Sequence, residues 1–156
     1  MRVTLCVVGR LRAGPERDLI DDYLTRFDRT GRALGLGPAS VIEVEGKKGG
    51  GSVAEAALLR KAIPDGAFLV TMDERGRVMT SPEFANKLAG WRDNSQRDLA
   101  IVIGGADGIA PELRAEADFS LSFGKMVWPH MLARVMLSEQ LYRAATILSG
   151  GPYHRA

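Results

Sequence analysis

The chain has 156 residues, of which 46% are hydrophobic and 26% charged, and its formal net charge is +2. This length suffices for one domain with a core of its own, and the small charge excludes a polycation that would bind nucleic acid through net charge alone. No run approaches the roughly 18 to 20 continuous apolar residues of a membrane-spanning helix.

The first element is a strand. Residues 2–9, "RVTLCVVG", form a continuous apolar run of the kind that is buried on both faces of a sheet. A signal peptide is a poorer interpretation, because the run is short and "GRLR" follows it without a small-residue cleavage site. Cys6 is the only cysteine, so we expect a buried structural thiol without an intramolecular disulfide. Since no Cys/His cluster could bind zinc, the sequence favours a metal-free protein of the reducing cytoplasm.

Helical and strand patterns then alternate along the chain. Pro15 and Gly31 bound the first stretch with helical spacing of apolar residues. Ser52, followed three residues later by Glu55, predicts a capping box at the start of the second helix, and "ERGR" at 74–77 predicts a turn. The further expected strands are 39–45, 66–73, 98–105 and 118–124, and the expected helices are 15–31, 52–63, 81–91, 110–117 and 129–148.

This alternation predicts an α/β fold with a mostly parallel sheet and helices on both faces. The chain shows no internal repeat, linker or low-complexity tract, so we expect residues 1–156 to form a single domain. In such folds ligands bind at the carboxyl ends of the strands, and three of these ends are unusual here: "IVIGGADG", "LSFGKMVWPH" and "VTMDERGR".

The first is "IVIGGADG", where Gly104 and Gly105 follow a buried strand and Gly108 comes three residues later. Glycines at such a point allow a ligand to approach the backbone closely. The spacing differs from the G-x-G-x-x-G of dinucleotide-binding proteins, and taken alone it favours a tight turn that needs positive φ. The P-loop and nucleophile-elbow motifs are also missing.

The second is "FGKMVWPHML", in which Met126, Val127 and Trp128 form an apolar loop between Gly124 and Pro129. Soluble loops rarely expose such side chains together, so we expect this one to line a pocket or an interface, and an adenine-like ring would suit it. The alternative is that Met126 and Trp128 anchor the last helix on the core.

The C-terminal part of the chain, from Lys125 onward, holds both histidines and four Lys or Arg residues against one acid. This charge fits an anionic partner, although an ordinary solvated face would look the same. The chemically active side chains are His130 and Arg134 in the last helix, and Tyr153, His154 and Arg155 in the tail "PYHRA". An imidazole with a pKa near ~6.5 can accept or hold a proton at neutral pH.

Four stretches together resemble the RlmH (YbeA-like) family of SPOUT-class methyltransferases: "VTMDERG", "IVIGGADG", "SFGKMVWPHMLARVMLSEQLYRA" and the terminal "PYHRA". The resemblance extends from the first strand to the last residue. It implies a homodimer of a small α/β domain in which the C-terminal segment forms a trefoil knot. General rules of chain topology would exclude a chain that threads through one of its own loops, as a knot requires.

The resemblance also implies an activity: methyl transfer from S-adenosylmethionine to N3 of a pseudouridine in 23S ribosomal RNA, preferably on the assembled ribosome. In many relatives a Leu stands where Met72 is, and both side chains are flexible and apolar. The cofactor-binding positions carried over by motif are Met72, Gly104, Gly105, Phe123, Gly124, Lys125, Met126, Val127 and Trp128.

The same resemblance implies how the acceptor is handled. Loss of the N3 proton must be assisted, and His130, with Arg134 stabilising negative charge on the uracil oxygens, is the candidate pair, although no single general base is assigned. Tyr153, His154 and Arg155 would stack on the base, bind phosphate and order the acceptor. In the family the tail of one subunit reaches the cofactor pocket of the other, so we expect the dimer to order the tail.

Two other functions stay open from the sequence. One is a non-catalytic RNA- or ribosome-binding protein that uses the same basic region. The other is a Rossmann-like nucleotide-binding enzyme in which Glu43 or Glu45 binds a ribose, and the missing glycine fingerprint argues against it.

Overall fold

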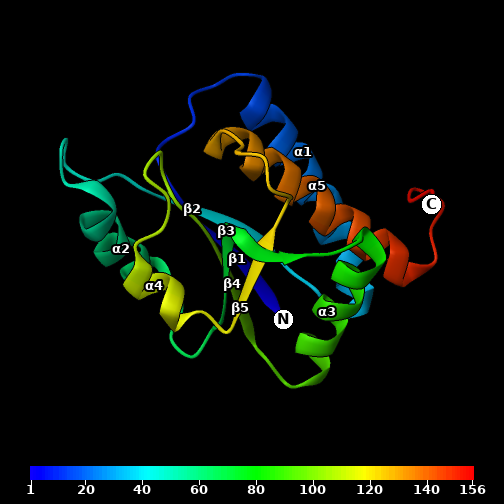
Figure 1. Ribbon diagram of the computed structural model, residues 1–156. Helices are drawn as coiled ribbons and strands as arrows, with labels where there is room; N and C mark the ends of the chain where they lie inside the picture. The colour runs from blue at the N-terminus through cyan, green and yellow to red at the C-terminus, as the bar shows by residue number, and fades with distance from the viewer.

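A computed structural model describes residues 1–156 and shows strands and helices in alternation (Figure 1). The elements in chain order are β1 (Arg2–Val8), α1 (Pro15–Gly31), the 3₁₀ helix η1 (Arg32–Leu34), β2 (Ala39–Val44), α2 (Gly51–Ala62), β3 (Phe68–Val78), α3 (Ser81–Asp93), β4 (Asp98–Ile103), α4 (Pro111–Glu116), β5 (Phe119–Ser122) and α5 (His130–Ser149).

The five strands form one sheet in the order β2-β1-β4-β3-β5, and every neighbouring pair is parallel. Helices α1, α3 and α5 pack on one face of this sheet, while α2 and α4 pack on the other (Figure 1). The predicted α/β class with a parallel sheet and helices on both faces is therefore confirmed. None of the helices combines the length and apolar content needed to cross a membrane.

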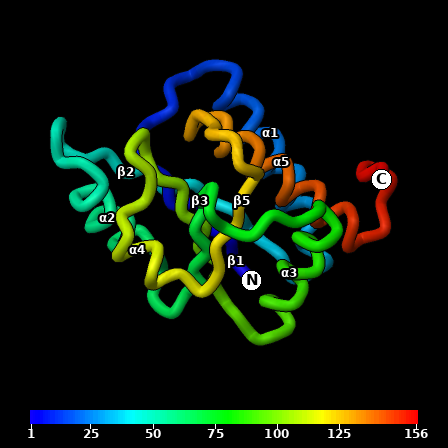
Figure 2. The backbone as a smooth tube through the Cα atoms, in the orientation of Figure 1, coloured from blue at the N-terminus to red at the C-terminus, as the bar shows by residue number.

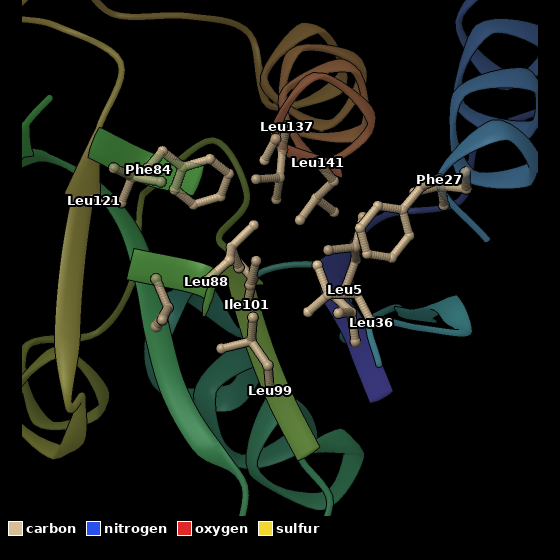
Figure 3. Close-up of a cluster of buried hydrophobic side chains, with 14 of the residues drawn as sticks. Leu5, Phe27, Leu36, Phe84, Leu88, Leu99, Ile101, Leu121, Leu137 and Leu141 are labelled. Atoms are coloured by element: carbon tan, nitrogen blue, oxygen red, sulfur yellow. The ribbon is translucent and has the colours of Figure 1, made fainter. Parts of the chain in front are cut away.

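Strand β1 lies inside the sheet and buries side chains on both faces, which explains its unbroken apolar sequence. Leu5 and Val7 belong to the larger core cluster, with Phe27 of α1 and Leu137 of α5 (Figure 3). Cys6 points to the smaller cluster under α2 and α4. Its thiol is buried and unpaired, as predicted, and burial raises its pKa to about 11.

The capping box predicted at Ser52 is wrong. Helix α2 begins one residue earlier, at Gly51, and has no side-chain cap, so Ser52 already lies in the first turn. A capping box forms instead at α3, where Thr80 Oγ1 accepts from the Glu83 amide at 3.2 Å and Glu83 Oε2 accepts from the Thr80 amide at 2.7 Å. The helix expected from Ser81 is thus capped by the residue before it.

The turn predicted at 74–77 is also wrong, because β3 continues through this segment to Val78. Met72 and Arg77 both pair with Leu121 of β5, so residues 73–76 bulge out of the strand. A Cβ at Gly76 would lie 2.8 Å from the backbone of Leu121, so only glycine fits where the bulge crosses β5. Pairing with a strand distant in the sequence has overridden the local turn signal.

Candidate functional site

A cavity of ≈ 890 Å³ opens at the carboxyl ends of β3, β4 and β5. This is the edge at which ligands bind in parallel sheets. Of the positions assigned to the cofactor, only Lys125 is not part of the wall. The eight that line the cavity are Met72, Gly104, Gly105, Phe123, Gly124, Met126, Val127 and Trp128.

The glycine loop after β4 forms one wall by close backbone packing. A Cβ at Gly104 would lie 2.7 Å from the backbone of Gly108, and a Cβ at Gly105 would lie 2.9 Å from the carboxylate of Glu55. Gly108 itself has φ +76, as a tight turn requires. The tight turn that the sequence favours is therefore present at Gly108, and the adjacent glycines are required by close packing within the protein. That a ligand approaches their backbone stays a prediction.

The charges of the cavity wall have a small acidic excess. The wall contains three carboxylates, those of Asp73, Glu74 and Asp107, and two guanidinium groups, those of Arg75 and Arg114. Asp73 Oδ2 lies 3.8 Å from both Arg75 Nη1 and Arg114 Nε, and Arg114 Nε is buried without a hydrogen-bond partner. Such a wall suits a small ligand with net positive charge that also carries an anionic group.

Glu55 lies behind the glycine loop and outside the cavity wall, and its spacing from Ser52 resembles that of a capping box. Its Oε1 atom is buried without a hydrogen-bond partner, and its carboxylate abuts Gly105. Burial, followed by the charge of Asp107, raises the pKa of Glu55. The side chain thus stands behind the glycine loop and not at the start of α2.

His130 is the first residue of α5 and lines the cavity, so it lies beside the cofactor-type residues as expected. Its Nδ1 atom is buried without a protein hydrogen-bond partner, and its Cε1 atom would be 3.5 Å from a Cβ built at Gly9. Burial, followed by the charge of Arg134, lowers the pKa of His130. The ring is therefore neutral at pH 7 and able to accept a proton.

Arg134 lies one turn further along α5 and is buried outside the cavity, with 1% of its surface exposed. Its Nη1 donates to Glu43 Oε2 at 2.9 Å, and its Nη2 donates to the carbonyl oxygens of Val8 and Gly9 at 3.2 and 3.1 Å. Glu43 also accepts from the Leu11 amide at 2.7 Å. In this position the guanidinium ties α5 to the ends of β1 and β2 and does not face the cavity.

The apolar loop before α5 is exposed. This decides between the two interpretations of its sequence, as the lining of a pocket or interface or as an anchor of the last helix on the core. Met126, Val127 and Trp128 are 74%, 82% and 42% exposed, and Met131 and Leu132 at the start of α5 are 40% and 42% exposed. These side chains therefore do not anchor the last helix on the core. They line the mouth of the cavity and continue as an apolar patch along α5.

The tail follows the C-terminal end of α5 (Figure 2), whereas the cavity is lined by His130 at the start of this helix. The tail folds back only as far as Glu139, nine residues or ~14 Å after His130, and Tyr153, His154 and Arg155 do not line the cavity of their own subunit. The expectation that only a dimer orders the tail is wrong: Tyr153 donates to Glu139 Oε1 at 2.9 Å, within the same chain.

The acids proposed for a Rossmann-like ribose site are engaged elsewhere. Glu43 is bound to Leu11 and Arg134, and Glu45 is exposed beside Arg10, with 3.7 Å between Arg10 Nε and Glu45 Oε2. Neither residue lines the cavity. The structure also contains no group of three or more His, Cys, Asp or Glu side chains placed to bind a metal ion.

Exposed cations without ion-pair partners lie on loops at the same edge of the sheet as the cavity. Arg12 follows β1, Lys47 and Lys48 follow β2, and Lys125 follows β5. These side chains are free to meet an anionic surface around the mouth of the cavity.

Comparison with known proteins relates the chain to methyltransferases. A family model described as a predicted SPOUT methyltransferase matches residues 1–154. Proteins named Ribosomal RNA large subunit methyltransferase H from Ruegeria pomeroyi, Dinoroseobacter shibae and Cereibacter sphaeroides are 74%, 73% and 66% identical to it, with 99% of each chain covered. A solved structure, a probable methylase family protein from Haemophilus influenzae, aligns with a TM-score of 0.52 at 14% identity, over 99% of this chain and 70% of that one, and shows the fold alone.

Proposed function

The chain belongs to the SPOUT methyltransferase family, and on this premise we propose that it methylates N3 of a pseudouridine in 23S ribosomal RNA, on the assembled ribosome in the cytoplasm, with S-adenosylmethionine as the methyl donor. The names of its relatives support ribosomal RNA as the substrate. The observation that carries the proposal is the single cavity wall formed by the glycine loop after β4 and the apolar loop before α5.

The cavity wall fits the cofactor in shape and charge. Gly104 and Gly105 line the cavity without a side chain, so an adenosine group could pack against their backbone. Met126 and Trp128 offer apolar contacts to a flat ring, and the acidic excess suits the positive charges of a sulfonium and an ammonium group. When bound, S-adenosylmethionine supplies an electrophilic methyl group. Arg75 and Arg114 are cations within the same wall and suit its carboxylate.

His130 is the side chain in the wall that suits the acceptor. Its neutral imidazole takes the N3 proton as the pseudouridine becomes nucleophilic, and its place at the start of α5 orients it toward the cavity. Arg134 acts indirectly in this proposal, because its hydrogen bonds to Val8, Gly9 and Glu43 fix the helix turn that carries His130. The protein's main task is alignment of donor and acceptor.

A homodimer completes the site. The tail packs back on α5 at Glu139, nine residues or ~14 Å along the helix from His130, and none of its residues lines its own cavity, so we assign Tyr153, His154 and Arg155 to the cavity of a second subunit. The apolar patch formed by Met126, Val127, Trp128, Met131 and Leu132 is a surface that such a partner would cover. Arg155 is exposed and makes no hydrogen bond within its own chain, so it is the tail residue that we assign to the RNA.

We assign the trefoil knot to the passage of the chain beyond β5. The support is the bulged part of β3, which crosses β5 at Gly76. A Cβ at Gly76 would lie 2.8 Å from the backbone of Ser120 and Leu121. After β5 the chain returns as α5 to pack between α1 and α3.

The proposal is tested by incubating the protein with isotopically labelled S-adenosylmethionine and three RNA substrates: free 23S ribosomal RNA, isolated large subunits and 70S ribosomes. Mass spectrometry of the nucleosides identifies the product. We expect labelled N3-methylpseudouridine, formed fastest on the 70S ribosome. Label in another nucleoside would contradict the assigned target, and cofactor binding without any methyl transfer would favour a non-catalytic RNA-binding protein.

A further inference from the structure

A polar cluster centred on Glu139 holds the last residues of the chain against α5. We propose that Glu139 and Arg143 are positioning residues that preform the C-terminal tail, residues 151–156, for its work on the acceptor side of the active site. The inference rests on the proposed function, because the tail has work to do only if the protein modifies an RNA base.

Glu139 is the hub of the cluster. Its Oε1 atom accepts three hydrogen bonds, from Arg143 Nη2 at 2.6 Å, from Arg143 Nε at 2.9 Å and from the Tyr153 hydroxyl at 2.9 Å. Its Oε2 atom accepts from Gln140 Nε2 at 3.0 Å. The side chains of Arg143 and Glu139 are 25% and 17% exposed, so this ion pair is screened less than a pair on the open surface.

Tyr153 is held at its ring as well as at its hydroxyl. The ring centroid lies 4.6 Å from that of Tyr142, and the Arg143 guanidinium carbon lies 4.8 Å from the centroid of the Tyr153 ring. Burial, followed by the hydrogen bond to Glu139, raises the pKa of Tyr153 to about 12. The hydroxyl therefore keeps its proton and donates at neutral pH, so the contact with Glu139 persists.

Arg143 also fixes the ring of His154. Its Nη1 lies 3.2 Å from His154 Nδ1. A guanidinium can only donate, so Nδ1 must accept, and the proton of the neutral imidazole then lies on Nε2. The tail consequently presents an N–H donor from His154 and the free guanidinium of Arg155.

The turn that directs the tail back to α5 is built separately. Gly150 ends the helix with φ 76, and the Gly151 amide donates to the Thr146 carbonyl at 2.9 Å. This turn would end the helix without any contribution from Glu139 or Arg143. The cluster is therefore not required to terminate α5. What it adds is a fixed orientation of the residues that follow.

The test compares Glu139→Ala and Tyr153→Phe, singly and combined, with Glu116→Gln as the control. The control weakens another Arg–Glu pair, Arg60–Glu116, which joins α2 to α4 at 2.7 Å and of which neither residue lines the cavity. Hydrogen–deuterium exchange reports the order of residues 151–156, calorimetry reports cofactor affinity, and steady-state methyl transfer to ribosomes gives kcat and KM.

We expect Glu139→Ala to speed exchange in the tail and to lower kcat at least about tenfold with unchanged cofactor affinity, as misplacement of an aligned group does. Tyr153→Phe should act in the same direction more weakly. It should add little to Glu139→Ala, because the two residues share one contact. The control should match wild type in every measurement.

Three results would overturn the proposal: unchanged tail exchange in Glu139→Ala, faster exchange with a wild-type kcat, or an equal loss of kcat in Glu116→Gln. Failure of the proposed function gives a different result, since wild-type protein would then not methylate ribosomes at all. The exchange comparison would still decide whether Glu139 holds the tail.

Discussion

At the residue scale, the proposed chemistry depends on one imidazole in the cavity wall. His130 is partly buried one helical turn from Arg134, and burial, followed by the charge of Arg134, lowers its pKa. A histidine whose folded pKa is lowered is neutral at pH 7 and becomes charged only as the pH falls below ~6.5. Because the charged form is disfavoured in the folded state, protonation of His130 also reduces stability in acid.

We therefore expect kcat/KM for methyl transfer to stay level near pH 7 and to fall only below the ordinary histidine range. His130→Ala should lower kcat on the order of 10²-fold, abolish that acidic limb and leave the cofactor affinity within about twofold. Rate profiles from pH 5 to 8 and calorimetric titration make the comparison. Equal losses in kcat and in cofactor affinity would instead identify His130 as a cofactor-binding residue.

The sequence singled out Arg134 but assigned its guanidinium to the wrong partners. The residue stands one helical turn from His130, and a sequence pattern does not reveal which way the guanidinium points. A buried arginine needs partners for its charge, and it finds them in Glu43 and in the carbonyl groups of Val8 and Gly9. Those partners lie far away in the chain, so only the fold identifies them.

At the element scale, the helices and strands follow from local patterns, while their ends depend on distant partners. The apolar runs of β1 and β4 and the spacing in α1 and α5 were sufficient to predict these elements. The extension of β3 beyond Met72 was not predictable, because pairing with β5 maintains the strand through a sequence that signals a turn. The same limit applies to caps, since Ser52 and Thr80 precede a Glu at the same spacing.

The two caps make a direct test. Thr80→Ala removes an observed side-chain cap and should lower the free energy of unfolding by about 1 kcal/mol. Ser52→Ala removes no cap hydrogen bond and should lie within about 0.5 kcal/mol of wild type. Urea unfolding followed by circular dichroism measures both. A larger loss for Ser52→Ala than for Thr80→Ala would contradict the observed helix starts.

At the scale of the whole molecule, helix α5 connects the cavity to the tail: its first residue, His130, lines the cavity, and the tail follows its last residue and packs back on Glu139. Eight of the nine cofactor positions carried over by family resemblance line the cavity, and the two loops that hold most of them also stand out in the sequence, because glycines and apolar residues directly after strands are unusual in any fold. It could not place the tail, since no local rule predicts that Tyr153 returns to Glu139. Dimer and knot came from family resemblance only, because they depend on surfaces and chain crossings that periodicity does not encode.

The central claim is that one active site combines the cavity of one subunit with the tail of another. Two inactive variants test it: a chain that lacks residues 153–156, and Gly104→Val, whose side chain would collide with the Gly108 backbone and block cofactor binding. Purified heterodimers of the two carry one intact cavity and one intact tail on different subunits.

The decisive measurement is the rate of methyl transfer to ribosomes by this heterodimer, compared with each parent homodimer. We predict that both parents are inactive and that the heterodimer has about half of the wild-type rate, since one of its two symmetric sites is complete. A heterodimer as inactive as its parents would contradict it, because each tail would then serve only its own subunit.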